Sequence, residues 1–110
     1  MENLNSFKGV ELIKKANIYF DGNVTSRTFI DVDGSKKSLG IMMVGEYVFG
    51  TVEAEKMEII EGEVEVRLKG EDGFKTYKSG SSFDVVANSS FEISKKNNRL
   101  LLFIYKLGVL

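Results

Sequence analysis

The sequence of 110 residues contains no cysteine, no histidine and no proline. Without cysteine it can form neither a disulfide nor a thiolate nucleophile, so its stability must come from packing. Histidine and cysteine are also the usual protein ligands of zinc and of other transition metals. Any chemistry in this chain is therefore expected to need no metal and no other cofactor. Because proline is absent, the turns must use glycine, asparagine and aspartate.

The charge is nearly balanced, with 15 Lys and Arg, 16 Asp and Glu, and a net charge of -1. Such a chain has no overall field to attract nucleic acid or an anionic membrane. The most apolar stretch, residues 100–110, is interrupted by Lys106 and is shorter than the ~20 residues of a membrane-spanning helix. Residues 1–15 hold no apolar core of signal-peptide length. We expect a cytoplasmic protein that binds neither nucleic acid nor membrane.

Turn signals built on glycine, aspartate and asparagine recur along the chain at roughly the 8–12-residue spacing typical of consecutive antiparallel strands. The pattern is clearest where Val64, Val66 and Leu68 alternate with charged residues. Residues 8–15 fit a short helix or an edge strand. The other segments predict short strands at 24–30, 37–43, 47–51, 57–60, 75–78, 82–86, 90–94 and 100–105. So many short strands favour an all-β sandwich or barrel, and a closed barrel leaves no exposed sheet edge.

The segment from Gly45 to Gly62 resembles the first motif of the cupin barrels, which opens and closes with glycine. Metal-binding cupins carry His-x-His and a nearby Glu in this motif, and a second motif supplies another His. Here Thr51 and Glu53 occupy the positions of the first two histidines. In the second motif, Phe91 stands in place of the remaining histidine. The resemblance implies a single-domain, cupin-like jelly-roll β-barrel over residues 1–110. Residues 1–16 form an N-terminal extension or an edge strand.

Over residues 17–105 the chain resembles one family in particular, the small metal-free cupins that act as pyrimidine/purine nucleoside phosphorylases. The resemblance rests on the order and spacing of short motifs: Tyr19-Phe-Asp-Gly22, Val24-Thr-Ser26, Leu39-Gly-Ile-Met42, Gly45-Glu-Tyr-Val-Phe49-Gly-Thr51, Glu53-x-Glu55-x-Met57-Glu-Ile-Ile-x-Gly62, Tyr77-x-x-Gly80-x-x-Phe83-x-Val85 and Ala87-Asn-Ser-Ser-Phe91. It implies phosphorolysis by a homodimeric pentosyltransferase. A nucleoside and inorganic phosphate would give a free base and ribose 1-phosphate, with broad tolerance of the base.

The chain departs from the family's usual pattern at four positions. Proline is usual where this chain has Val44 and Val86, and frequent at Ala54, and the usual cysteine of the last strand is replaced by Phe103. Because Val44 and Val86 are expected in loops at the barrel mouth, these changes bear on loop rigidity and substrate preference rather than on the fold.

Phosphorolysis needs no enzyme nucleophile, because phosphate attacks the anomeric carbon as the base leaves through an oxocarbenium-like state. The site needs donors for an anion, and Ser26, Arg27, Lys36 and Ser38 are the candidates, with arginine offering a bidentate fork. The alternative for Arg27 and Lys36 is that they are solvated strand and turn residues.

Thr51 and Glu53 are the candidate catalytic residues. The Thr51 hydroxyl is a further phosphate donor, and the Glu53 carboxylate suits the ribose hydroxyls or the positive charge of the oxocarbenium. Glu55 offers the same chemistry, and both acids fit an exposed loop equally well. Phe49, Met57 and Phe91 are candidates for binding the base, with the alternative that they are core residues.

Two other functions are compatible with the sequence. The barrel could bind a sugar or a nucleoside without turning it over, or it could be a structural dimer module filled with side chains. We expect a homodimer, as the family resemblance implies and because the apolar segments 10–13 and 100–105 exceed what a small barrel covers.

Overall fold

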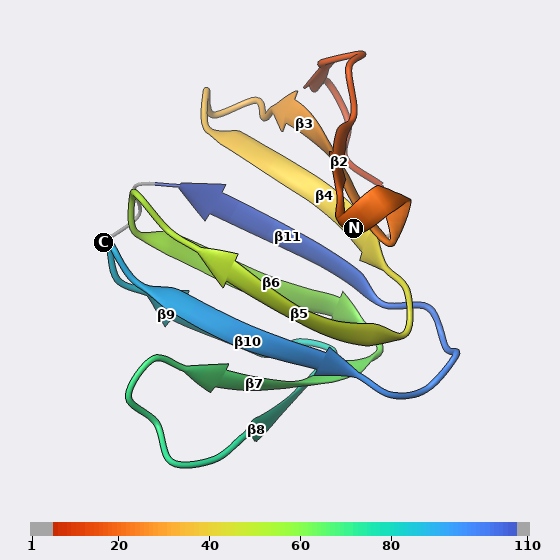
Figure 1. Cartoon of the computed structure of the whole chain (residues 1–110). Helices are drawn as coiled ribbons and strands as arrows, with labels where there is room; N and C mark the ends of the chain where they lie inside the picture. The colour runs from red at the N-terminus through yellow and green to blue at the C-terminus, as the bar shows by residue number, and fades with distance from the viewer. Residues whose placement is uncertain (1–5, 108–110) are drawn as a thin grey trace.

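The computed structural model describes residues 6–107, which form two facing antiparallel sheets (Figure 1). The elements in chain order are β1 (Glu11–Leu12), β2 (Asn17–Tyr19), the 3-10 turn η1 (Phe20–Gly22), β3 (Val24–Ile30), β4 (Lys36–Met42), β5 (Gly45–Gly50), β6 (Glu55–Glu61), β7 (Glu63–Leu68), β8 (Lys75–Lys78), β9 (Ser82–Val85), β10 (Ser90–Lys95) and β11 (Leu102–Leu107). The predicted all-β class is confirmed.

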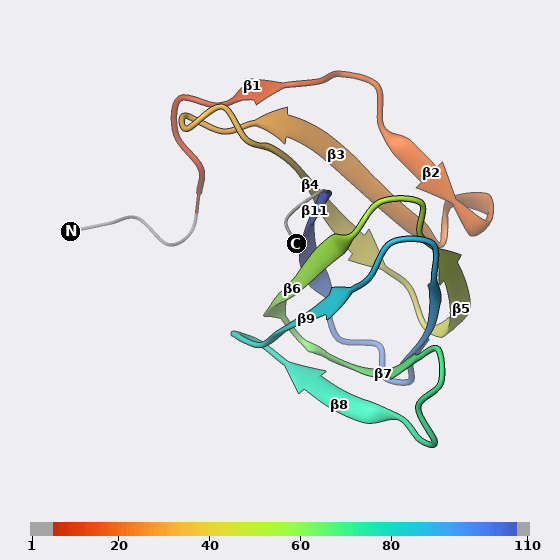
Figure 2. The same cartoon turned by 90° about the vertical axis from the view of Figure 1, so that its left-hand side faces the viewer.

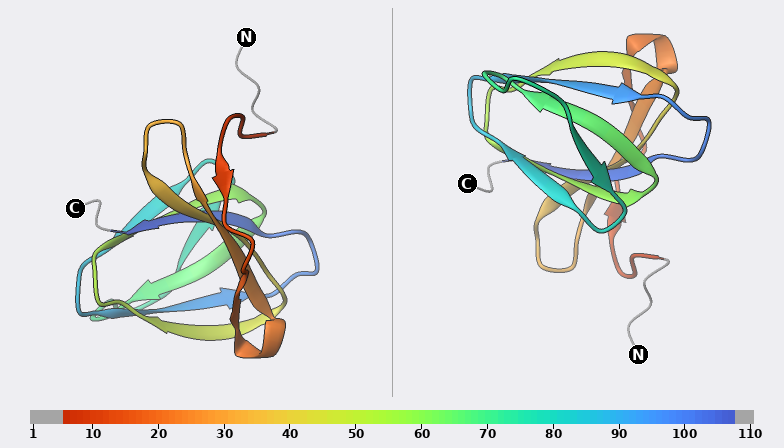
Figure 3. Two further views of the ribbon diagram at one scale, coloured as in Figure 1. Left: turned by 90° about the horizontal axis from the view of Figure 1, so that it is seen from above. Right: turned by 90° about the horizontal axis from the view of Figure 1, so that it is seen from below.

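The larger sheet has the order β1-β3-β4-β11-β6-β9, with β2 also paired to β3, and the smaller sheet has the order β5-β10-β7-β8. Every pairing is antiparallel. The two sheets close around a common interior, and β1, β2 and β3 extend the wall on one side (Figure 2). The hairpin of β3 and β4 projects beyond the rest of the barrel (Figure 3). Strands from both ends of the sequence therefore lie beside the interior.

Most of the predicted strands are found in the structure. β3 and β8 have the predicted bounds, and the other predicted strands are found within a few residues of theirs. The segment that fitted either a helix or an edge strand contains the edge strand β1, paired with the end of β3. The sequence did not predict β2, which is only three residues long and carries no alternation.

The core lies between the sheets and consists of alternate residues of the strands. On β7, Val64 and Val66 are buried between more exposed charged neighbours, as the alternation predicted. Gly40 on β4 faces the Phe103 ring of β11 so closely that a Cβ at this position would collide with the ring. The glycine therefore makes the room in which Phe103 lies flat against the wall of the interior.

The only helical element among residues 6–107 is η1, and no helix of this part of the chain is long and apolar enough to cross a membrane.

Candidate functional site

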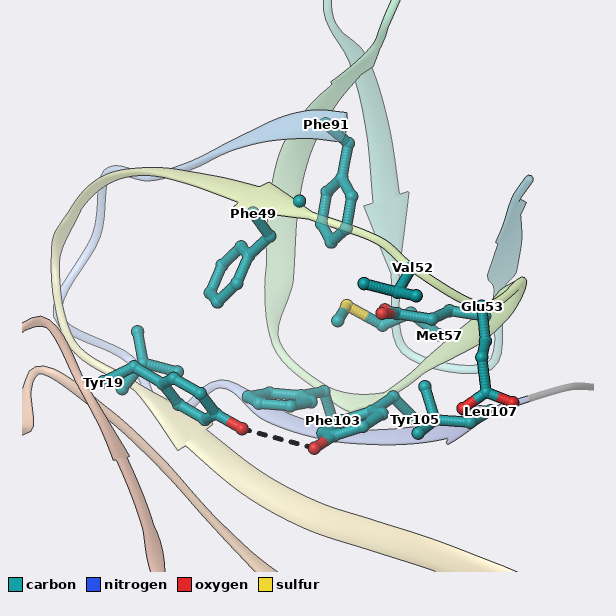
Figure 4. A pocket seen from close by; sticks show the side chains of 12 residues that line it. Tyr19, Phe49, Val52, Glu53, Met57, Phe91, Phe103, Tyr105 and Leu107 are labelled. Carbon is teal, nitrogen blue, oxygen red and sulfur yellow. Dashed lines mark hydrogen bonds between the residues drawn. The ribbon is translucent and has the colours of Figure 1, made fainter. Parts of the chain in front are cut away.

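A pocket of about 300 Å³ opens at one end of the interior (Figure 4). This volume lies at the lower end of the ~300–1,000 Å³ typical of small-molecule sites. Val24, Met57, Phe91 and Phe103 form its buried walls, and Val52 stands exposed at its mouth. The remaining lining residues are Tyr19, Phe49, Gly50, Glu53, Glu55, Tyr105 and Leu107. We call it the apolar pocket, because most of its surface is carbon.

Aromatic rings face one another across the apolar pocket. On one side Phe49 and Phe91 stack with their ring centroids 5.4 Å apart and their planes at 21°. On the other side lie Tyr19, Phe103 and Tyr105 (Figure 4). Phe103 and Tyr105 are two residues apart on β11 and also stack, at 6.4 Å and 23°. A flat heterocycle between these two sides would meet apolar faces above and below.

Tyr19 reaches the pocket because of the turn that follows it. In η1 the backbone of Phe20 and Asp21 is left-handed, with φ of 52° and 56°. This conformation is rare for a residue as bulky as phenylalanine. The Phe20 ring packs against Tyr47 and Phe49, at centroid distances of 4.9 and 5.3 Å, and these contacts hold the turn in place. The turn thereby fixes Tyr19 beside the mouth of the apolar pocket.

The hydroxyls of Tyr19 and Tyr105 are 3.4 Å apart, although 86 residues separate them in the sequence. Burial, followed by this hydrogen bond, raises the pKa of Tyr19 to about 12. The nearby Glu55 carboxylate adds to the rise, while a hydrogen bond with Ser26 opposes it. The Tyr19 phenol therefore stays protonated at neutral pH and acts as a hydrogen-bond donor or acceptor, not as a base.

A second pocket, of about 600 Å³, adjoins the first and shares Glu53, Tyr105 and Leu107 with it. Its other lining residues are Asn17, Thr28, Ser35, Lys36, Ser38 and Lys106. We call it the polar pocket, because all of its lining residues except Leu107 carry a polar or charged side-chain group. Glu53 and Tyr105 mark the boundary between an apolar compartment and a polar one.

A hydrogen-bonded network forms the wall of the polar pocket. The Asn17 side-chain amide donates to the hydroxyls of Ser26 and Thr28, each at 3.1 Å, and the hydroxyls of Thr28 and Ser38 are 3.1 Å apart. The strand register explains the network, because Asn17 pairs with Ser26 and Thr28 pairs with Ser38. Since Thr28 accepts from Asn17, its own proton can point to Ser38, which leaves the Ser38 proton for a ligand.

The structure brings most of the predicted site residues to these two pockets. Phe49, Met57, Phe91 and Glu53 line the apolar pocket, and Glu53, Lys36 and Ser38 line the polar pocket. Ser26 is fully buried behind the wall and supports the network instead of facing the pocket.

Two predicted residues lie elsewhere. Thr51 lines neither pocket, and its hydroxyl donates to the Val86 carbonyl at 2.8 Å and accepts from the Ser89 amide at 2.9 Å. It ties the loop that carries Glu53 to the loop between β9 and β10, so it acts by positioning. Arg27 alternates with inward-facing Ser26 and lies on the outer face of β3, where its guanidinium donates to Thr25 at 2.8 Å.

Sequence reasoning did not select Tyr19, Tyr105 or Asn17 for the site. Tyr19 opens one of the motifs quoted above, and this was the one signal for it. Tyr105 was predicted only as the last residue of an apolar strand near the end of the chain. Asn17 gains its role from pairing with β3, which no local pattern indicates.

Within residues 6–107, no three His, Cys, Asp or Glu side chains gather in a group that could hold a metal ion.

Comparison with known proteins gives consistent results. The model of a family described as pyrimidine/purine nucleoside phosphorylase matches residues 14–102. A pyrimidine/purine nucleoside phosphorylase from Geotalea daltonii is 55% identical over 93 residues, which cover 84% of this chain and 89% of that protein. The crystal structure of an Acinetobacter protein described as of unknown function is 36% identical, with a TM-score of 0.86 over 93% of this chain and 97% of that one.

A more distant structure shows the fold alone. An RmlC-like cupin from Shewanella frigidimarina is 16% identical, with a TM-score of 0.62 over 99% of this chain and 94% of that chain. The barrel is therefore cupin-like, as the glycine frame predicted.

Proposed function

The chain belongs to the pyrimidine/purine nucleoside phosphorylase family, and from this premise we propose that it cleaves purine and pyrimidine nucleosides with inorganic phosphate. The products are the free base and ribose 1-phosphate, which makes the protein a pentosyltransferase. The observation that carries the proposal is the junction of the two pockets. A nucleoside has a flat apolar part and a polar part, and phosphate must approach the carbon between them.

In this proposal the base lies in the apolar pocket against Phe49 and Phe91. Offset aromatic contacts contribute about 0.5–1.5 kcal/mol and differ little between bases, because every base has a flat face. Few polar side chains line this pocket, so few groups can discriminate one base edge from another. These features support broad specificity.

The ribose lies at the boundary, and phosphate lies in the polar pocket. Glu53 lines both pockets, so its carboxylate can bond ribose hydroxyls and stabilise positive charge on the ring. Ser38 and Lys36 offer donors to phosphate. Metal independence is also part of the proposal, because the sequence supplies neither histidine nor cysteine as ligands.

The test is phosphate-dependent release of base. Purified, chelator-treated protein is incubated with adenosine, guanosine, inosine and uridine, with and without phosphate, and base and ribose 1-phosphate are separated by chromatography. We expect base and ribose 1-phosphate in equal amounts when phosphate is present, and neither product without it. Treatment with the chelator should not change this result. Binding of a nucleoside without any product would contradict phosphorolysis and favour a binding protein. Release only after a divalent metal is restored would contradict metal independence.

The proposal includes a homodimer, but the structure changes the surface that supports it. β11 lies between β4 and β6, and its residues Phe103 and Ile104 are buried, so this strand offers no free apolar edge. On the N-terminal strands, in contrast, Leu12 is 62% exposed and Ile18 is 66% exposed. Both project from the outer face of the larger sheet, as the register with Phe29 and Thr25 shows.

We expect the mass in solution to be that of a dimer at micromolar concentration, and Ile18→Lys to shift it toward the monomer, because the substitution places a charge in the apolar contact. Sedimentation velocity measures both. Val48→Lys is the matched control, since Val48 is 62% exposed on the other sheet and should leave the mass unchanged. A monomeric mass for the unaltered protein would contradict the dimer. A shift by both variants would contradict the assigned surface.

A further inference from the structure

The two carboxylates near the pockets, Glu53 and Glu55, have different surroundings. Glu53 is exposed in the loop between β5 and β6 and lines both pockets. Glu55 is the first residue of β6 and lines the apolar pocket, but not the polar one. It is half-buried and pairs across the sheet with Leu107 on β11 and Val85 on β9, which are both apolar. Of the two acids, Glu55 is therefore the one that lines the apolar pocket without also lining the polar pocket.

The groups around Glu55 favour a neutral carboxyl. Burial raises its pKa above the ordinary value. The titratable groups that share the apolar pocket with it are Glu53, Tyr19 and Tyr105, and the described residues of its lining include no lysine or arginine. The neighbouring Lys56 and Lys106 pair with each other and, by the alternation of the strands, lie on the opposite face from Glu55. In this pocket the carboxyl thus has phenols, carbon and a second carboxylate around it, and no described lining residue supplies a cation to hold its charge.

We propose that Glu55 is the general acid that protonates the departing base. This role rests on the proposed phosphorolysis. A phosphate oxygen forms a bond to C1′ of the ribose, the C1′–N bond breaks, and its electron pair remains on the base. The base takes the Glu55 proton at N7 of a purine or at O2 of a pyrimidine. All four phosphate oxygens remain in ribose 1-phosphate, the attacking one as the bridge to C1′, and the P–OH proton of the monohydrogen phosphate returns through solvent to the Glu55 carboxylate.

The position of Glu55 also fits a broad substrate range. Purines and pyrimidines differ in size and in most of their polar edges, but each offers an acceptor near the glycosidic nitrogen. A single carboxyl at the side of an apolar pocket can serve both acceptors without recognising the rest of the base. Glu55 then protonates the base and Glu53 stabilises the ribose, and their different surroundings set these separate roles.

The test uses leaving groups that need no proton. Nicotinamide riboside and 7-methylguanosine carry a positive charge on the base, which leaves the ribose without protonation. We expect Glu55→Gln to reduce kcat/KM for guanosine and uridine by about 100-fold or more, in line with the ~10²–10⁴-fold contribution of general acids. For the two charged nucleosides we expect a loss of less than about threefold. Glu53→Gln is the comparison, and it should slow both classes.

If Glu55→Gln lowers kcat/KM by a similar factor for both classes of nucleoside, the acid role is overturned and a binding or structural role is left. Full activity on guanosine would overturn it as well. If the unaltered protein releases no base from any nucleoside, the proposed function fails and this role with it. If it is active and Glu55→Gln behaves like the unaltered protein, only the acid role fails.

The pH profile gives a second readout that does not depend on how well a variant folds. A general acid works when protonated, so kcat for guanosine should be highest below the pKa of Glu55 and fall as pH rises through it. This falling limb should be absent with nicotinamide riboside. An identical limb with both substrates would contradict the role.

In the folded protein the Glu55 carboxyl binds its proton more tightly than in the unfolded chain, so its ionisation costs stability as pH rises between the two pKa values. Glu55→Gln should therefore be no less stable at neutral pH.

Discussion

Glu53→Gln is expected to lower kcat/KM for nucleoside phosphorolysis by about 100-fold, with less than about 0.5 kcal/mol change in the free energy of unfolding. The large effect on rate follows from charge. The amide keeps the shape of the side chain but has no negative charge for the oxocarbenium-like ribose. The small effect on stability follows from exposure, because Glu53 stands in a loop at the mouth of both pockets.

Initial rates of base release and urea unfolding curves measure the two effects of Glu53→Gln. Glu61→Gln is the matched control, since Glu61 is exposed at the far end of β6 and outside both pockets. It should change neither quantity. Unchanged turnover in Glu53→Gln would place the ribose elsewhere. A loss of stability comparable to the loss of rate would give Glu53 a structural role.

Phe91→Ala is expected to lower the free energy of unfolding by about 3–5 kcal/mol, because it deletes a large buried ring and leaves a cavity. Phe91 is 2% exposed, stacks on Phe49 and meets the edge of Phe83 at a centroid distance of 5.6 Å. Since domains of this size are stable by only about 5–15 kcal/mol, the change is a large share of the total. Urea unfolding followed by circular dichroism measures it.

Phe74→Ala is the control for Phe91→Ala. Phe74 is 40% exposed, and the Arg67 guanidinium lies 5.0 Å from its ring centroid. Such a contact contributes about 0.5–1 kcal/mol at an exposed site. Equal losses in the two variants would show that the apolar pocket is not part of the cooperative core. Compared with Glu53→Gln, these two variants distinguish a residue that stabilises the pocket from a residue that takes part in the reaction.

The division between predictable and unpredictable site residues follows strand chemistry. Phe49, Met57 and Phe91 were candidates for the base site because a base ring must lie against apolar side chains, and an apolar residue of a strand faces the interior whether it binds a ligand or packs the core. In β3 the same argument gives no answer, since Thr25, Ser26, Arg27 and Thr28 are all polar and either set could face inward. The structure turns Ser26 and Thr28 inward and Arg27 outward.

Loop residues were harder to place than strand residues. Thr51 follows the end of β5, where the alternation stops. Its direction is set by hydrogen bonds to Val86 and Ser89, more than thirty residues away. The correspondence with a metal-ligand position predicted a side chain in the site, but a hydroxyl has two backbone partners within reach here and uses both. Thr51 thus stands at the position of a cupin metal ligand, but its hydroxyl bonds the backbone and not a ligand.

The sequence by itself determined the all-β class, the positions of most strands and the absence of histidine and cysteine ligands, because alternation, turn residues and composition are local properties. Only the tertiary structure decided that Tyr19 meets Tyr105, that Asn17 completes a hydroxyl network, and that Glu53 and Glu55 stand in different environments. These contacts depend on the register of strands far apart in the chain. That register is selected by burying the whole interior at once, and no segment of the sequence carries it alone.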